Sequence, residues 1–538
     1  MVRRQRRATS GWRDRAATVA LLLGLIGISY RLILLLLDVP GSNSDEGTFG
    51  LVALHIAQGR GWPIYLYGQH YMGVVESYLA APLFVVFTPS WLLLRLPLLL
   101  LYALFLVLAY RLTRELYSPW LATVTVGLLA LGSERVVRDQ MTAVGGRAEA
   151  KPAVLALLLI AIALAAGRVR RPRATLAVFG LIAGAALWSD WLVAPYLAAA
   201  VAVLLVSARR IPGTGWVLLV GAGIVGALPM IVDNVTAPPG QDSWSVLRRL
   251  HAEAGPPAPL TDRLHGALLE GVPLATGVCR ASGCAPWQEA WGILAVVLLL
   301  VAAALAGAEL WRQRAVATDD THTRTARGVA QLGLAAAALV TVVAYARSPA
   351  SAATPLASAR YLTYLQISLP VMLWPLWRAG AAAWSAAGGW RRLGGHLALV
   401  LLATTAVAMV VATAGQIASI GAVRAEERRA RALADTLLAA GITHVYGEYW
   451  TCNRLIFYTR ERVICAVVRA DLGLGHNRYP PYLRQVQAAP TAAYAVVADD
   501  PADRALRAHL ASRGIPARVI ELDGYRIYEP AVPIRPKA

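Results

Sequence analysis

Two adjacent carboxylates, Asp45 and Glu46, follow the first strongly apolar stretch of the chain, roughly residues 16–37. Acidic side chains at the end of a membrane helix lie where water meets lipid, and that position is costly unless they are solvated or functional. A carboxylate held there can serve as a general base. The simpler alternative is a helix cap, with Ser44 or Asp45 as the N-cap and Glu46 in the first turn of the next helix.

The stretch that follows favours the functional alternative. Polar and aromatic side chains crowd together here between apolar segments, and Glu76 is enclosed by apolar neighbours on both sides. An acid in such surroundings is hard to explain as a solvated surface residue. We therefore expect this stretch to line a substrate pocket beside the carboxylate pair, through Tyr67, Gln69, His70 and Glu76.

The composition indicates a polytopic helical membrane protein. Hydrophobic residues make up 57% of the 538 residues and charged residues only 15%. Apolar runs near the length that crosses a bilayer recur along the chain. The net charge of +20 lies largely in short basic clusters between these runs. That distribution is typical of cytoplasmic loops, so we expect a plasma-membrane protein whose partner is the lipid bilayer, and no nucleic-acid partner.

Apolar runs and basic clusters predict about eleven transmembrane helices, the last two of them at about residues 361–376 and 397–417. The first run is too long for a signal peptide and lacks an Ala-x-Ala cleavage pattern, so a retained helix with a cytoplasmic N-terminus is expected. Residues 1–419 would form the transmembrane domain. On its outer side we expect juxtamembrane helices at about residues 45–88 and a long loop at about residues 233–288.

The composition changes after Ile420. A charged amphipathic helix at residues 424–439 precedes several short β-rich runs and a helical stretch at residues 503–513. Alternating strands and helices predict a small α/β domain over residues 420–538. An odd number of spans after a cytoplasmic N-terminus places this domain outside the cytoplasm.

The four cysteines all fall on the predicted outer side, where disulfides persist. Cys279 and Cys284 would close a tight loop, and Cys452 and Cys465 would join two neighbouring strands. The alternative is four free, buried thiols. Neither pair has the spacing of a zinc site with nearby histidines.

The same topology gathers further charged residues on the outer face. Three begin one span, another ends a span, and a pair begins a late span: Arg147, Glu149, Lys151, Asp190, Arg360 and Tyr361. Each has a simple alternative as a solvated turn, an interfacial residue or an aromatic-belt anchor. Their shared side favours one site. Arginines and helix N-termini bind phosphate, so a base with a phosphate clamp suits transfer of a group from a lipid phosphate to a hydroxyl.

These motifs resemble those of the GT-C glycosyltransferases, and most closely a bacterial family 39-like group. That group is related to protein O-mannosyltransferases and to the transferase that adds aminoarabinose to lipid A. The resemblance rests on residues 44–51, 67–73 and 76–81, on Gly-Gly-Arg-Ala-Glu at 145–149 and on Arg360-Tyr361. It extends to the tail at residues 449–450, 461–464 and 478–482. Arg147 stands where the group more often has an aromatic residue.

The resemblance implies an inverting glycosyltransferase with a polyprenyl-phosphate sugar donor, a hydroxyl acceptor and a site facing away from the cytoplasm. In the expected mechanism Asp45 takes the acceptor proton, and Glu46 orients Asp45 or shares that proton. Arg360, with Lys151 or Arg147, would hold the leaving phosphate. The scheme requires no metal, and a divalent cation held by Asp45 with Glu46 or Glu76 is the alternative.

A transporter or flippase for a lipid-linked or sugar substrate is the rival from another class. Transporters often show repeated halves, broken helices at matching positions and ionisable groups near mid-membrane. The sequence shows no internal repeat, and its acids lie near the ends of the predicted helices.

Overall fold

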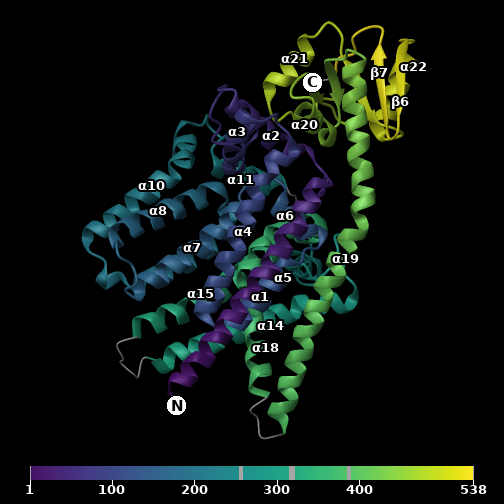
Figure 1. Ribbon diagram of the computed structural model, residues 1–538. Coiled ribbons are helices and arrows are strands. Elements are labelled where there is room, and N and C mark those ends of the chain that lie inside the picture. Colours follow the sequence, from purple (N-terminus) through teal and green to yellow (C-terminus); the bar gives the residue numbers. More distant parts are fainter. Residues whose placement is uncertain (1, 254–257, 314–320, 384–388, 537–538) are drawn as a thin grey trace. The chain divides into compact units, whose positions relative to one another are not determined.

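The computed structural model describes residues 2–253, 258–313, 321–383 and 389–536 (Figure 1). The contacts divide the chain into two compact units. The first unit comprises residues 1–32, 98–141 and 146–418, and the second comprises residues 33–97, 142–145 and 419–538. Three helices, α1, α4 and α19, run from one unit into the other along the chain.

The first unit is helical. Its longer elements are α1 (Val2–Leu36), α4 (Trp91–Leu116), α5 (Pro119–Ala130), α6 (Glu134–Met141), α7 (Arg147–Ala165), α8 (Pro172–Ser189), α9 (Ala194–Leu205), α10 (Gly213–Thr236), α14 (Pro286–Gln313), α15 (Thr321–Arg347), α18 (Leu369–Ala383) and α19 (Trp390–Ala439). Shorter elements are η1 (Trp191–Val193), η2 (Ala208–Arg210), α11 (Ser243–Glu253), α12 (Leu260–Leu264), η3 (His265–Gly271), α13 (Val272–Thr276), α16 (Ala350–Ala353), α17 (Pro355–Ser358) and η4 (Ala359–Ser368).

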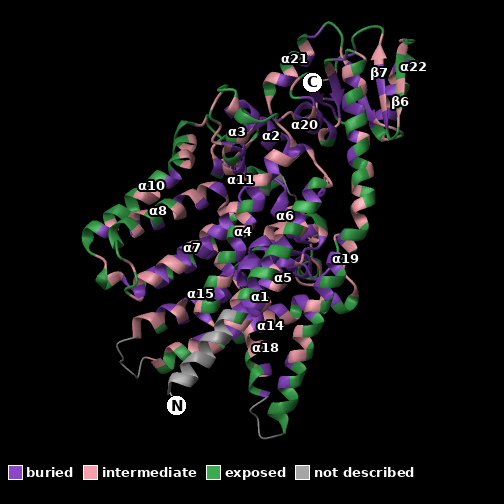
Figure 2. Ribbon diagram, in the orientation of Figure 1, coloured by how far each residue is buried: buried purple, intermediate pink, exposed green. Residues whose placement is uncertain are grey.

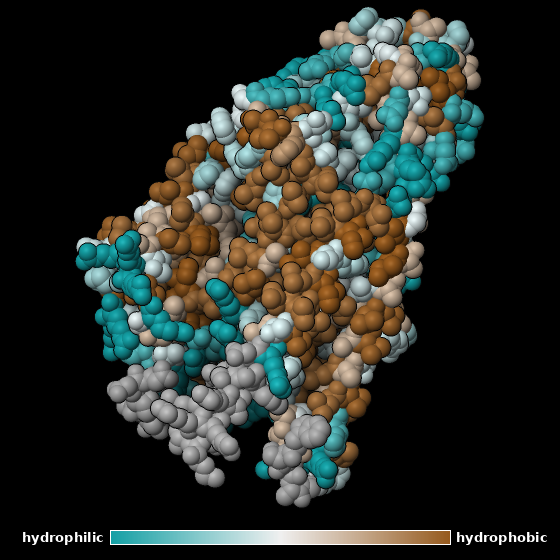
Figure 3. Space-filling model, in the orientation of Figure 1, coloured by the Kyte–Doolittle hydropathy of each residue, from teal (hydrophilic) through white to brown (hydrophobic). Residues whose placement is uncertain are grey.

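Eight helices in the described part of the chain are long and apolar enough to cross a membrane: α1, α4, α7, α8, α10, α14, α15 and α19. Helices α5 and α6 meet at a bend of 91° and make a ninth span if they count as one. The predicted polytopic membrane protein is confirmed, and Figure 3 shows hydrophobic residues gathered over the helical part of the chain. The number of about eleven spans stays a prediction.

Several elements differ from the sequence-based expectation. The predicted span at residues 361–376 divides into the 3₁₀ segment η4 and the α-helix α18. The predicted long loop contains α11, α12, the π-helical η3 and α13, and its residues 254–257 lie outside the described part. The predicted last span and amphipathic helix form one helix of 50 residues, α19. No proline interrupts that stretch, and its Ala, Leu, Arg and Glu residues favour helix.

The second unit begins with α2 (Ser44–Ala57), a hairpin of β1 (Tyr65–Leu66) and β2 (Gln69–Gly73), and α3 (Val75–Val86). Its C-terminal part has strands β3 (His444–Gly447), β4 (Ile464–Val467), β5 (Ala493–Val497), β6 (Ala517–Leu522) and β7 (Tyr525–Pro530). Three helices accompany them: α20 (Tyr449–Tyr458), α21 (Pro480–Ala488) and α22 (Pro501–Ser512).

The five strands form one sheet in the order β4-β3-β5-β7-β6. Strand β3 is parallel to both β4 and β5, and β7 is antiparallel to β5 and β6. The predicted small α/β region is confirmed. Both candidate disulfides are present: Cys279–Cys284 in the first unit, and Cys452–Cys465, with its Cα atoms 5.1 Å apart. Cys452 lies on α20, so the second bridge joins a helix to β4 and not two neighbouring strands as expected.

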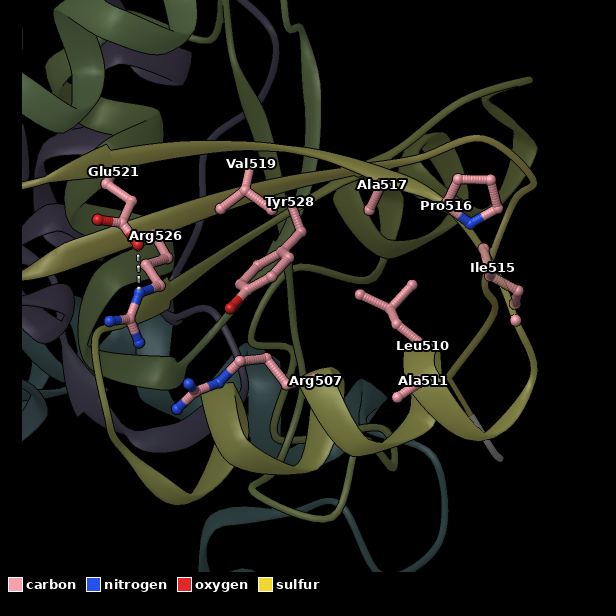
Figure 4. A pocket seen from close by; sticks show the side chains of 11 residues that line it. Arg507, Leu510, Ala511, Ile515, Pro516, Ala517, Val519, Glu521, Arg526 and Tyr528 are labelled. Carbon is pink, nitrogen blue, oxygen red and sulfur yellow. Dashed lines mark hydrogen bonds and ion pairs between the residues drawn. The ribbon is translucent and has the colours of Figure 1, made fainter.

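A cavity of about 640 Å³ lies between α22 and the strands β6 and β7 (Figure 4). Its charged lining residues already have partners. Arg526 pairs with Asp503 at 2.5 Å and with Glu521 at 3.3 Å, and Arg507 pairs with Asp503 at 3.3 Å. None of the residues that the sequence analysis selected lines it. We therefore assign this cavity no part in the candidate site.

Helices α8 and α10 approach each other through glycines. A Cβ atom added at Gly180 would lie 2.0 Å from the Leu219 carbonyl oxygen, and one at Gly184 would lie 2.1 Å from the Gly223 carbonyl oxygen. Small residues allow membrane helices to pack backbone against backbone. The close packing of α8 on α10 therefore requires glycine at Gly180 and Gly184.

Gly184→Val should lower the stability of the protein by roughly 1–3 kcal/mol, because the added side chain overlaps the α10 backbone. The melting temperature in detergent measures this loss. Gly221→Val is the matched control, because nothing lies within 4 Å of a Cβ atom at that position of α10. Equal melting temperatures for both variants would contradict the close contact.

Candidate functional site

The first predicted acids lie at the start of α2. Asn43 is the N-cap, since its side chain accepts the Glu46 backbone N–H at 3.0 Å. In the simpler alternative, the choice of Ser44 or Asp45 as the N-cap is therefore wrong, whereas the place of Glu46 in the first turn is right. The acids occupy the first turn of the helix, where their charge interacts favourably with the N-terminal end.

Glu46 is fully buried and held by Arg95 of α4. Arg95 Nε donates to Glu46 Oε1 at 2.7 Å, and Nη2 donates to Oε2 at 2.5 Å. The backbone N–H of Ala143 also donates to Oε1, at 3.3 Å. Such a bidentate pair is among the strongest charge-assisted contacts in proteins. Glu46 is thus a buried structural anion, and its charge is balanced by one guanidinium.

Asp45 has different surroundings. Its Oδ1 accepts hydrogen bonds from Tyr449 Oη and from Arg478 Nη2, the latter at 2.8 Å. Its side chain keeps 26% of its surface exposed. In the part of the chain that the structure describes, no group donates a hydrogen bond to Oδ2. Asp45 therefore combines one anchored oxygen with one that remains available to a ligand.

The residues expected to line the pocket lie in the same unit. Tyr67 Oη is 2.6 Å from His55 Nδ1, and Gln69 and His70 lie half-buried on β2. Glu76, in the first turn of α3, is fully buried and accepts the Gly145 backbone N–H at 2.9 Å. Like Glu46, it is therefore tied to the 142–145 segment.

A buried polar network around His55 was missed by the sequence analysis. His55 Nε2 is 3.1 Å from both Glu461 Oε1 and Tyr482 Oη, and Tyr482 donates to Glu461 at 2.7 Å. Arg60 also pairs with Glu461. Burial by itself raises the pKa of Glu461, but the hydrogen bonds from His55, Arg60 and Tyr482 outweigh it and lower the pKa to about 2. Glu461 belongs to the motif at residues 461–464, but nothing in that motif indicated which residues it contacts.

The remaining predicted residues lie in the first unit. Arg147 Nη1 is 3.2 Å from Asp139 Oδ1, and Arg135 binds the same oxygen. Lys151, 2% exposed, donates to Gln366 Oε1 at 3.2 Å. These side chains, on α6, α7 and η4, are all buried. Helix α7 has the largest share of buried residues among the eight apolar helices (Figure 2). Sequence spacing gave no reason to select Arg135, Asp139 or Gln366.

The other predicted residues of the first unit, Glu149, Asp190 and Arg360, also have close contacts. Ser189 donates to Glu149, and Tyr364 Oη donates to Asp190 Oδ2 at 2.7 Å. Arg360 lies in η4 with its guanidinium 5.2 Å from the centre of the Tyr361 ring. A Cβ atom at Gly146 would lie 2.2 Å from Asp190 Cβ, so the glycine permits this approach.

The structure thus arranges the predicted residues in two groups. Asp45, Glu46 and the pocket residues belong to the second unit, and the group from Arg147 to Tyr361 belongs to the first. A single site that joins the two groups stays a prediction. Across the described ranges, no three His, Cys, Asp or Glu side chains come together as a metal site.

Comparison with solved structures identifies the fold. The crystal structure of ArnT from Cupriavidus metallidurans bound to undecaprenyl phosphate matches with a TM-score of 0.55 and 14% identity, over 97% of this chain and 98% of ArnT. The apo structure matches with a TM-score of 0.52 and 15% identity, over 98% of both chains. This chain shares its fold with ArnT. The ArnT-like membrane fold that the sequence resemblance implied is therefore confirmed.

A more distant match is the oligosaccharyltransferase of Archaeoglobus fulgidus, with a TM-score of 0.47 and 12% identity over 90% of this chain and 69% of that one. Its score is too low to support an argument. No protein-family profile matches the sequence, and no curated protein matches it.

Glu461→Gln should destabilise the protein at neutral pH and much less in acid. The folded-state pKa of about 2 lies below the usual value of 4.5, so the ionised carboxylate contributes stability above pH 4.5 that is lost as the pH falls toward 2. Melting temperatures in detergent at pH 7, 5 and 3 would show a difference between wild type and variant that narrows with acid. Glu521→Gln, at an exposed position on β6, is the control. A difference independent of pH would contradict the assignment.

Proposed function

We propose that this protein is an inverting glycosyltransferase that moves a sugar from a polyprenyl-phosphate donor to a hydroxyl acceptor, at a site facing away from the cytoplasm. The observation that carries the proposal is Asp45, a partly exposed carboxylate with one anchored oxygen and one that accepts no hydrogen bond from the described residues. The fold supports it, because ArnT, which shares this fold, was crystallised with undecaprenyl phosphate.

In the proposed reaction the acceptor oxygen forms a bond to the anomeric carbon of the donor sugar. The bond between that carbon and the lipid-phosphate oxygen breaks on the opposite face, so the configuration inverts. The electron pair of the broken bond stays on the phosphate, which leaves as free lipid phosphate. Asp45 takes the hydroxyl proton as the new bond forms.

The phosphate would meet the cationic group of the first unit. There, three basic residues, Arg135, Arg147 and Lys151, lie near the acid Asp139, and the two arginines pair with it directly. Arg360 is close enough to Arg147 for their charges to interact. Buried charges need compensation, and a phosphate would supply it. Negative charge grows on the leaving phosphate in the transition state, so fixed cations there favour the reaction as well as binding.

The contacts of the two acids support a different proposed role for each. Glu46 is occupied by Arg95, so in this proposal it fixes the first turn of α2 and thereby the direction of Asp45. Tyr67, Gln69 and His70 would contact the sugar or the acceptor. Glu149 and Asp190 would shape the phosphate side of the pocket with Tyr361.

The test is to incubate the purified protein in detergent with a panel of radiolabelled polyprenyl-phosphate sugars and to follow release of the lipid phosphate. Asp45→Asn keeps the shape of the side chain and removes the proton acceptor, so turnover should fall by about 10²-fold or more while donor binding survives. Asp471→Asn, in an exposed loop, is the control. Near-normal turnover by Asp45→Asn would place the base elsewhere, and transport of the lipid-linked sugar without release would point to a flippase.

Arg360→Lys tests the phosphate clamp. A planar guanidinium can engage two phosphate oxygens, whereas an ammonium is a point charge, so donor affinity should fall by about tenfold or more. An arginine that only anchors η4 to lipid headgroups would tolerate lysine, because both side chains snorkel. Arg312→Lys, at an exposed position of α14, is the control. Equal donor-binding curves for wild type and Arg360→Lys would leave Arg147 and Lys151 as the clamp.

A further inference from the structure

Helix α2 packs directly on α20, and its sequence is adapted to that contact. A Cβ atom at Gly47 would lie 2.6 Å from the Asn453 carbonyl oxygen, and one at Gly50 would lie 2.7 Å from the Phe457 ring. No side chain larger than hydrogen fits at either position without movement of the neighbour. The two glycines of this motif therefore serve the approach of α20.

The polar residues of the motif bind the same helix. Ser44 Oγ donates to the Tyr449 carbonyl oxygen and accepts the Asn453 backbone N–H at 3.1 Å. Asn453 Nδ2 donates to Thr48 Oγ1 at 2.9 Å. Close packing and hydrogen bonds together fix the first turn of α2, which carries Asp45, against the first turn of α20.

Asp45 closes a triangle with two residues of the C-terminal part. Arg478 Nη2 donates to Asp45 Oδ1 at 2.8 Å, and Arg478 Nε donates to Tyr449 Oη at 2.5 Å. Tyr449 Oη in turn donates to Asp45 Oδ1. Arg478 is 5% exposed, and its Nη1 is buried without a hydrogen-bond partner in the described part of the chain. The triangle thus fixes one carboxylate oxygen with two donors and places a cation beside it.

Both donors are themselves held firmly. The disulfide Cys452–Cys465 ties α20, and with it Tyr449, to β4. Asn477, next to Arg478, accepts the Val467 N–H of β4 at 2.7 Å and donates to the Val467 carbonyl oxygen at 3.1 Å. The sheet therefore sets the positions of Tyr449 and Arg478.

We infer that Tyr449 and Arg478 are positioning residues for Asp45, and that the C-terminal sheet region is for this reason part of the catalytic apparatus. This inference rests on the proposed function. By binding Oδ1, the two donors leave Oδ2 for the acceptor proton and remove the rotational freedom of the carboxylate. Correct orientation of a reacting group is worth orders of magnitude in rate.

The alternative is a contact that only stabilises the packing of α2 on α20. The two explanations predict different effects on turnover. A purely structural contact changes the melting temperature and leaves kcat at saturating donor unchanged. A positioning contact changes kcat at saturating donor, because it acts on the group that takes the proton.

The experiment compares Tyr449→Phe, Arg478→Gln and Arg478→Lys with Asp45→Asn in the lipid-phosphate release assay. Tyr449→Phe and Arg478→Gln should lower kcat by about 10–100-fold with little change in the KM for the donor. Arg478→Lys should recover part of the lost kcat, since it restores a cationic donor beside Asp45.

Thr48→Val is the matched control within the same interface. It removes the hydrogen bond to Asn453 without touching Asp45, so it should lower the melting temperature and leave kcat unchanged. If the Tyr449 and Arg478 variants behave like Thr48→Val while Asp45→Asn is inactive, the inference is overturned and the assignment of Asp45 as the base stands. Near-normal turnover by Asp45→Asn would overturn the assignment of the base, and the inference with it.

Discussion

The packing of α2 on α20 is the constraint on which the second unit depends. It joins a segment near residue 45 to one near residue 450, and it requires glycine at two positions. Loop closure over such a separation costs conformational entropy that the contact must offset. The ring of Phe457, packed edge-on to Trp91 with ring centres 4.7 Å apart, adds apolar burial beside the glycines. Close backbone approach, hydrogen bonds and aromatic packing therefore act on the same short helix.

Helix geometry separates the roles of the two neighbouring acids. Consecutive residues of an α-helix point about 100° apart, so Asp45 and Glu46 cannot face the same partner. Glu46 turns inward to Arg95, and Asp45 turns toward Tyr449 and Arg478. Removing one partner of a buried ion pair leaves an uncompensated charge, at a cost of roughly 3–5 kcal/mol. A pair that reads in the sequence as one acidic motif is thus one structural anion and one partly exposed carboxylate.

The elements that could be predicted from the sequence are those with a clear hydrophobic or β-rich pattern. Apolar runs gave the membrane helices, and β-rich runs near residues 444, 464, 494, 518 and 526 gave the strands of the sheet. Short elements were missed, including the hairpin at residues 65–73 and α20, because a few residues carry too little periodicity to identify. The partners of the acids were missed for another reason. Arg95 and Arg478 are 49 and 433 residues from the acids they bind, and no local spacing marks such a pair.

Two of the sets of motifs behind the resemblance to glycosyltransferases lie near the first loop and in the tail. The structure gives a physical reason for both. Ser44, Asp45 and Gly47 contact the segment that begins at Tyr449, and His55 contacts Glu461 and Tyr482. The two sets are therefore opposite sides of one interface within the second unit. Residues on one side are constrained by residues on the other, because a change in shape or charge at either side leaves a buried partner unsatisfied. The residues of the motif around Asp45 are therefore constrained by packing as much as by chemistry.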